Sequence, residues 1–256
     1  VNSNQTYKLK PLPRFKITIQ YDGSSFSGWQ LQKNRKTVQG EIENALKVIS
    51  RSKLRIPVHG SGRTDSGVHA YGQVAHFDLD TKLDSSELCN AINSNTAKEC
   101  KIMSVVESDN GFESRFDARK RWYRYQVYKG SSILYRNQAW LINDIDVSLL
   151  RLVSKIILGE HDFLSFSKYR ADQKNTRSII FESNWQDNES MLTYEISGNR
   201  FLHHMVRYLV GTMVQVSRGQ FTIEQFRSLL HEPQKNVQIH RAPACGLILL
   251  RVEYDK

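Results

Sequence analysis

Apolar and polar residues follow two different periods in the first 110 residues. Residues 15–22, FKITIQYD, alternate strictly, which predicts a strand buried on one face. The apolar residues of 38–49 recur every three or four positions, which predicts a helix with Thr37 as its N-cap. A second helix is predicted at 84–93, beginning with a capping box at Asp84. Further strands are predicted at residues 55–59, 73–80 and 101–106.

The rest of the chain repeats this mixture of strands and helices. A helix is predicted at 146–158, capped by Asp146 and closed by Gly159, and a long helix at about 200–217. A short helix begins at Thr222, where Gln225 completes a capping box. Strands are predicted at 121–128, at 247–254, and at 177–186 and 191–197, which form a hairpin around Asp187 and Asn188.

This order of elements predicts an α+β protein made of two halves. The segment ESDNGFES, residues 107–114, is the most linker-like stretch, so we place the boundary there. The predicted units are a basic N-terminal arm at residues 1–13, an N-terminal α/β domain at 14–108 and a C-terminal α/β domain at 109–256. The arm is purely basic because the first acidic residue of the chain is Asp22.

Composition indicates a globular protein with an anionic partner. The chain is 39% hydrophobic and 24% charged, and its net charge is +10. Such an excess of positive charge attracts polyanions, nucleic acid first and acidic membrane second, although many basic proteins have no such partner. The three cysteines are far apart, which argues against a zinc site or a disulfide framework and suits a reducing, cytoplasmic location. No apolar run approaches transmembrane length, so no membrane partner is expected.

The stretch HGSGRTDSGVHAYGQVAHFD, residues 59–78, is the densest candidate for a functional loop. Gly60 and Gly62 fit the start of a dinucleotide fingerprint, but Asp65 stands at the third glycine position and a strand follows instead of a helix. The lysine and hydroxyl residue of a P-loop are also absent. The residues present therefore fit neither the dinucleotide fingerprint nor the P-loop, which argues against a nucleotide cofactor.

Metal binding is the second interpretation of the polar residues. His203 and His204 are adjacent on the predicted long helix, where neighbouring side chains diverge by about 100° and do not face one ion. Asp65, His69 and His76 show no recognised metal-binding spacing. We therefore expect no metal site.

The remaining interpretation is a carboxylate held in a glycine-shaped turn. Glycines permit backbone angles that let Asp65 project toward a closely approaching ligand, and the nearby Arg63 would keep it ionised. A carboxylate held in this way can act as a nucleophile or a base. The alternative is a local pair between Asp65 and Arg63 that only stabilises the turn.

Two other segments bear on this choice. In residues 118–128, ARKRWYRYQVY, arginines and aromatic residues interleave along a strand, as in RNA-binding surfaces, although an ordinary aromatic strand gives the same pattern. Arg207 lies within an otherwise apolar helix, where it is costly unless it meets an anion. Asp65 is a candidate for that anion.

Six blocks of the sequence together resemble the TruA family of tRNA pseudouridine synthases. They occur in this order: YDGSSFSGWQLQ, GSGRTDSGVHAYGQVAHFD, RFDARKRWYRYQVY, GEHDFLSF, FLHHMVRYLVG and APACGLILLRVEY. The resemblance implies two α/β halves, with antiparallel sheets and flanking helices, around a central basic cleft. It also implies a homodimer that needs no cofactor and isomerises uridine to pseudouridine at positions 38, 39 and 40 of the tRNA anticodon stem-loop.

The resemblance also assigns roles to individual residues. Asp65 matches the catalytic nucleophile, Arg63 the arginine of the same loop, Tyr123 the tyrosine that stacks on the substrate, and Arg207 the arginine that pairs with the carboxylate. The chain departs from the family pattern at Ser61, where alanine is usual, and in NSNTAKEC, which lacks the usual proline. Remaining alternatives are a synthase with other tRNA or RNA target uridines, and a non-catalytic RNA-binding protein.

Overall fold

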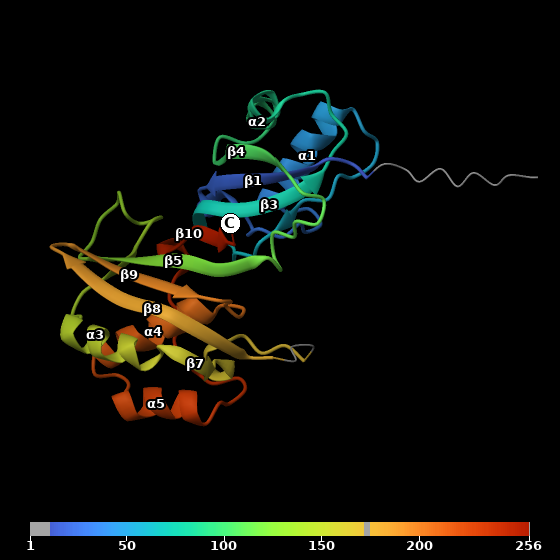
Figure 1. The fold of residues 1–256 in the computed structure, drawn as a ribbon. Coiled ribbons are helices and arrows are strands. Elements are labelled where there is room, and N and C mark those ends of the chain that lie inside the picture. The colour runs from blue at the N-terminus through green and yellow to red at the C-terminus, as the bar shows by residue number, and fades with distance from the viewer. Residues whose placement is uncertain (1–10, 172–174, 256) are drawn as a thin grey trace, which may run out of the picture.

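The computed structural model describes residues 11–171 and 175–255. These residues form a ten-stranded, mostly antiparallel sheet with five α-helices (Figure 1), which confirms the predicted α+β class. Along the sheet the strands run in the order β4-β1-β3-β10-β5-β9-β8-β7, with β2 paired to β3 and β6 to β5. The strands are β1 Arg14–Tyr21, β2 His59–Gly60, β3 His69–Asp78, β4 Cys100–Ser108, β5 Ala118–Lys129, β6 Trp140–Ile142, β7 Gly159–Asp162, β8 Arg177–Asn188, β9 Met191–Gly198 and β10 Leu247–Tyr254.

Strand β10 joins the two halves of the chain into one sheet. It comes from the end of the sequence, yet it lies between β3 and β5 (Figure 1). It pairs in parallel with β3 and antiparallel with β5. Without β10, the edges of β3 and β5 would leave unpaired backbone groups in the middle of the molecule. The antiparallel sheets expected for the two halves are therefore continuous.

The helices begin where the sequence predicts side-chain caps. Thr37 caps α1, Asp146 caps α3, and Asp84 and Thr222 begin α2 and α5 with complete capping boxes. Each cap satisfies backbone N–H groups that the first helical turn leaves free. The helices are α1 Val38–Ser50, α2 Ser85–Ser94, α3 Val147–Ile156, α4 Met205–Ser217 and α5 Ile223–His231.

Several predicted boundaries are wrong. Residues 55–58 do not pair as a strand: Pro57 has no N–H to donate, and Val58 donates to the side chain of Glu43. The turn of the β8–β9 hairpin lies at Glu189, two residues beyond the predicted one. Helix α3 ends at Ile156, and Gly159 begins β7 instead of closing the helix.

The start of α4 is the error that matters most for the site. The apolar pattern extends back to residue 201, but the helix begins only at Met205. His204 has a φ of 65°, in the left-handed region, so the backbone cannot continue as a right-handed helix through it. His203 and His204 therefore form a turn that presents two polar side chains at the helix N-terminus.

The central strands bury one face. Their register places Tyr21, Ala70, Leu249 and Tyr123 side by side across four strands, and all four are buried. Successive side chains on a strand point to opposite faces, so the next residues along each strand lie on the other side of the sheet. The buried face carries the loop with Asp65, described below.

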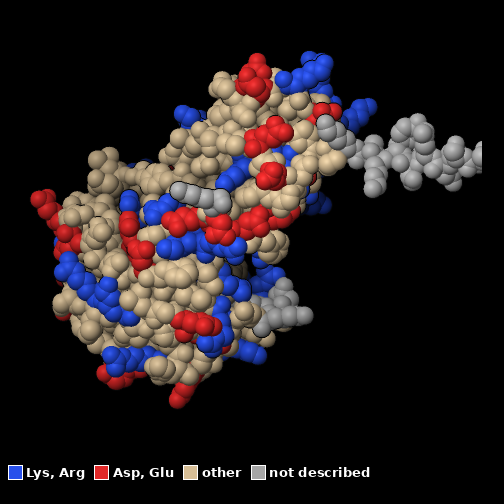
Figure 2. Space-filling view, viewed as in Figure 1, with Lys and Arg blue, Asp and Glu red and all other residues tan. Residues whose placement is uncertain are grey.

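The opposite face of β5 is occupied by ion pairs and aromatic contacts. Arg124 contacts Glu195 at 2.6 Å, and the indole of Trp122 donates to Glu253 at 2.6 Å. Figure 2 shows basic and acidic side chains interleaved across the middle of the view. On this face, the arginine and the tryptophan of the pattern predicted for RNA stacking are therefore already engaged by carboxylates of the protein itself.

The predicted basic arm lies mostly outside the described residues, which begin at Pro11. Among the helices that the structure describes, none has the length and apolar character needed to cross a bilayer.

Candidate active site

Asp65 lies in the turn between β2 and β3, and its side chain is 18% exposed. Residues 21–29 brace this turn. The Tyr21 and Thr64 hydroxyls are hydrogen-bonded at 2.8 Å, and the Trp29 N–H donates to the Thr64 carbonyl at 3.1 Å. Gly28 has a φ of 93°, and a Cβ there would lie 2.8 Å from the Thr64 oxygen. Only glycine fits this close approach without strain. Gly28 therefore lets its backbone pack directly against that of Thr64, which holds the loop in place.

Arg207 of α4 reaches the carboxylate from the other half of the chain. Its Nη1 donates to Asp65 Oδ2 at 2.8 Å, and its Nε donates to the Ala242 carbonyl at 2.8 Å. The Arg207 side chain is only 10% exposed. The anion expected to accompany an arginine in an apolar helix is therefore Asp65.

Arg63 does not form the predicted pair with Asp65. Its side chain is exposed, and no hydrogen bond or ion pair joins these two described residues. Thr64, between them, turns its hydroxyl inward to Tyr21. The cation that holds the carboxylate comes from α4, and Arg63 instead lines the mouth of the same pocket.

His203 and His204 both approach Asp65, contrary to the expectation that they diverge. They precede α4, so the helical angle of 100° does not apply to them. The Nε2 atom of His203 lies 3.7 Å from Oδ1, and that of His204 lies 3.4 Å from Oδ2. Burial lowers the pKa of both imidazoles, that of His204 to about 4, so both are neutral at neutral pH. Sequence reasoning missed this contact because it rests on the left-handed backbone at His204.

The two histidines and Asp65 bring three donor atoms within 4.8 Å of one another, a spacing that a metal ion could bridge. Two observations argue against this use. Arg207 already brings a positive charge to Oδ2. Arg241 contacts His204 Nδ1 at 2.9 Å, and because arginine only donates, the neutral ring carries its proton on Nε2, the atom facing Asp65. The arrangement favours a hydrogen-bonded carboxylate over a metal ligand.

Tyr123 of β5 forms another wall of the Asp65 pocket. Its ring packs edge-to-face on Phe201, with 5.2 Å between centroids. Burial raises the pKa of the phenol to about 12, so it is uncharged at neutral pH. The cavity has a volume of about 40 Å³, room for a few water molecules. A nucleobase can enter only if side chains around the cavity move.

The surroundings of the pocket are basic. Lys168, Arg170 and Arg241 all lie close enough to His203 to lower its pKa, after the larger effect of burial. The exposed Arg63 adds a further cation at the mouth. Such a cluster attracts phosphate groups.

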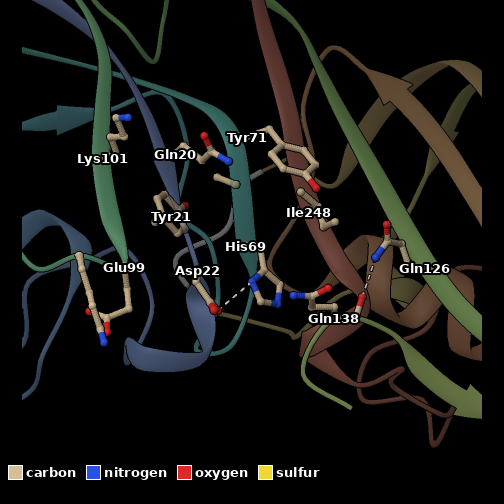
Figure 3. Close-up of a pocket in the computed structure, with 12 residues that line it drawn as sticks. Gln20, Tyr21, Asp22, His69, Tyr71, Glu99, Lys101, Gln126, Gln138 and Ile248 are labelled. Atoms are coloured by element: carbon tan, nitrogen blue, oxygen red, sulfur yellow. Dashed lines mark hydrogen bonds and ion pairs between the residues drawn. The ribbon is translucent and has the colours of Figure 1, made fainter. Parts of the chain in front are cut away.

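A larger pocket, of about 450 Å³, lies on the face of the sheet away from Asp65. Figure 3 shows the residues that line it. Ile248 and His69 line it, and they neighbour Leu249 and Ala70, which face the Asp65 side. Figure 3 shows Asp22 facing His69, whose Nδ1 lies 3.1 Å from the carboxylate. The pocket carries carboxylates as well as lysines, so it lacks the uniform charge of the Asp65 pocket rim.

Known proteins with similar sequences cover almost the whole chain. A bacterial relative from Bacillus subtilis, named tRNA pseudouridine synthase A, is 37% identical over 94% of this chain and 99% of its own. Relatives of the same name from Ehrlichia chaffeensis and Maridesulfovibrio salexigens are 39% and 38% identical, over 94% and 96% of this chain and 100% and 92% of their own.

The model of a protein family, described as tRNA pseudouridine synthase, matches residues 17–117 and 153–255. These ranges contain the Asp65 loop and the whole of α4, whereas β5 with Tyr123 lies between them. The matched segments thus include the two that meet in the Asp65–Arg207 contact. The chain belongs to the tRNA pseudouridine synthase family, and its activity is that of an isomerase acting on tRNA.

Proposed function

We propose that this enzyme converts uridine to pseudouridine at positions 38, 39 and 40 of the tRNA anticodon stem-loop, with Asp65 as the nucleophile. One observation carries the assignment of Asp65. Its carboxylate, held by the buried Arg207, shares a pocket with the Tyr123 ring. A protein that only bound RNA would gain nothing from a carboxylate placed among cations that attract phosphates.

The reaction detaches uracil from C1′ through N1, turns it and rejoins it through C5. Asp65 could add to the sugar or the ring, or remove the C2′ proton to give a glycal. All three routes need an ionised carboxylate beside the base and sugar. Arg207 places a fixed positive charge 2.8 Å from the carboxylate, and no redox step or external group is involved.

The target uridine must leave its stack and enter a pocket that is nearly closed. Extruding a base costs a few kcal/mol. Stacking on the Tyr123 ring returns about 1–3 kcal/mol per base. Phe201, which packs against Tyr123, is the neighbour that we expect to move when the base inserts.

Tyr123→Leu should lower turnover strongly while bulk tRNA affinity changes by less than about threefold, because a flipped base loses its aromatic partner. Tyr123→Phe should retain much more turnover than Tyr123→Leu, since it keeps the ring. Single-turnover rates and filter-binding affinities for both variants test this. A collapse of tRNA affinity in Tyr123→Leu would instead make Tyr123 a docking residue.

The target positions are tested with anticodon-arm transcripts that carry a single uridine at 38, 39 or 40, or at none of them. We expect pseudouridine in the first three and none in the last. Modification of the last transcript, or of uridines elsewhere in full-length tRNA at a comparable rate, would assign a different target specificity.

We also propose that the enzyme acts in the cytoplasm as a homodimer. Ile133 and Leu134, in the loop after β5, are 76% and 84% exposed, an unusual exposure for large apolar side chains that a second copy would reduce. Sedimentation of the purified chain tests this: a monomer at micromolar concentration would contradict it.

A further inference from the structure

The backbone at His204 is strained without a local reason. A left-handed conformation at a residue other than glycine costs free energy and persists only where the surrounding structure requires it. His204 occupies the N-cap position of α4, yet its side chain makes no capping hydrogen bond. The strain therefore does not serve to start the helix. Its evident effect is to turn the imidazole toward Asp65.

Contacts on both ring nitrogens fix the orientation of this imidazole. Arg241 donates to Nδ1 at 2.9 Å, which places the proton of the neutral ring on Nε2. Nε2 lies 3.4 Å from Asp65 Oδ2, and the side chain is 10% exposed. This separation is slightly longer than a good hydrogen bond, as is common for catalytic contacts before the substrate binds.

The two carboxylate oxygens of Asp65 have different surroundings. Oδ2 receives Arg207 at 2.8 Å and faces His204 at 3.4 Å. Oδ1 faces the partly exposed His203, whose Nε2 lies 3.7 Å away, and no hydrogen bond among the described residues reaches this oxygen. Two groups on one oxygen set the rotation of the carboxylate and leave the other oxygen free to react.

We propose that His204 is a positioning residue: together with Arg207 it anchors Oδ2 of Asp65, so that Oδ1 is the oxygen presented to the substrate. The inference rests on the proposed role of Asp65. The left-handed turn before α4 and the Arg241 contact then both serve to orient the reactive carboxylate.

Three substitutions of His204 separate orientation from folding. His204→Gly relieves the backbone strain, so this variant should fold at least as stably as the wild type. His204→Asn tolerates the left-handed backbone, but its amide is too short to reach Asp65. His204→Gln places an amide N–H near the position of Nε2. His231→Gln, at the exposed end of α5, controls for the loss of a histidine elsewhere.

The Gly and Asn variants should lose about 10- to 100-fold in kcat, with KM for tRNA nearly unchanged. The Gln variant should recover most of this loss, and added imidazole should raise the kcat of His204→Gly but not of His231→Gln. Thermal melting of each variant verifies that it is folded. A purely structural role predicts neither the recovery by glutamine nor the rescue by imidazole.

Wild-type kcat in His204→Gly or His204→Asn would overturn the inference, and so would equal losses in the Asn and Gln variants without imidazole rescue. Asp65→Ala is assayed in parallel. Activity in Asp65→Ala would overturn the proposed function itself, whereas an inactive Asp65→Ala beside fully active His204 variants would refute only the role of His204.

Discussion

Replacing Arg207 with glutamine should slow pseudouridine formation by about 100- to 1,000-fold while tRNA affinity stays within about threefold of the wild type. Glutamine removes the charge that contacts Asp65 at 2.8 Å, and the carboxylate then keeps only the longer His204 contact, at 3.4 Å. Because Arg207 lies inside the protein and not among the exposed cations of the rim, its loss should affect the chemical step more than the capture of RNA.

The same substitution should also lower the stability of the fold. Asp65 and Arg207 are 142 residues apart in sequence, and their ion pair connects the two halves of the chain. Removing one partner of a largely buried pair costs about 3 kcal/mol, because the other charge stays behind without compensation. Urea unfolding of Arg207→Gln measures this cost.

Arg207→Lys gives a graded comparison. Lysine keeps the charge, but a single ammonium group cannot reproduce the guanidinium that contacts both Asp65 and the Ala242 carbonyl. We expect its turnover to lie between those of the wild type and Arg207→Gln. Arg227→Gln, on the exposed side of α5, is the matched control for loss of an arginine. Wild-type turnover in Arg207→Gln would show that the ion pair is not needed for the reaction.

Local signals in the sequence predict most of the secondary structure. The caps at Thr37, Asp84, Asp146 and Thr222 need only residues within one helical turn, and all four are confirmed. The start of α4 could not be found in this way, because the apolar periodicity continues on the N-terminal side of Met205, the first residue of the helix. What stops the helix is the backbone at His204, whose partners Asp65 and Arg241 are distant in sequence.

The residues of the site were likewise predictable from the local sequence, but their partners were not. The sequence singles out Asp65 by its glycine-rich loop and Arg207 by its apolar surroundings, each from its own neighbourhood. Proximity in sequence then misleads, because Arg63 is two residues from Asp65 and yet makes no ion pair with it. The actual partner depends on β10 and α4 bringing the two halves together, which is a property of the tertiary fold.

Asp65→Asn and Asp65→Ala should each reduce pseudouridine formation by about 10,000-fold or more, since neither side chain can act as a nucleophile or a base. Asparagine is nearly the same shape as aspartate, so it should keep the contact with Arg207 and the geometry of the loop. Binding should survive in both variants, because the tRNA phosphates are held by the surrounding cations. Asp80→Asn, in the segment after β3, is an exposed control.

The most direct measurement is the release of tritium from tRNA labelled at uridine C5, because C5 loses its hydrogen when it bonds to the sugar. We expect the wild type and Asp80→Asn to release tritium at equal rates. We expect none from Asp65→Ala at enzyme concentrations that saturate the tRNA. Release by Asp65→Ala at a rate near that of the wild type would contradict the assignment of the reaction to this carboxylate.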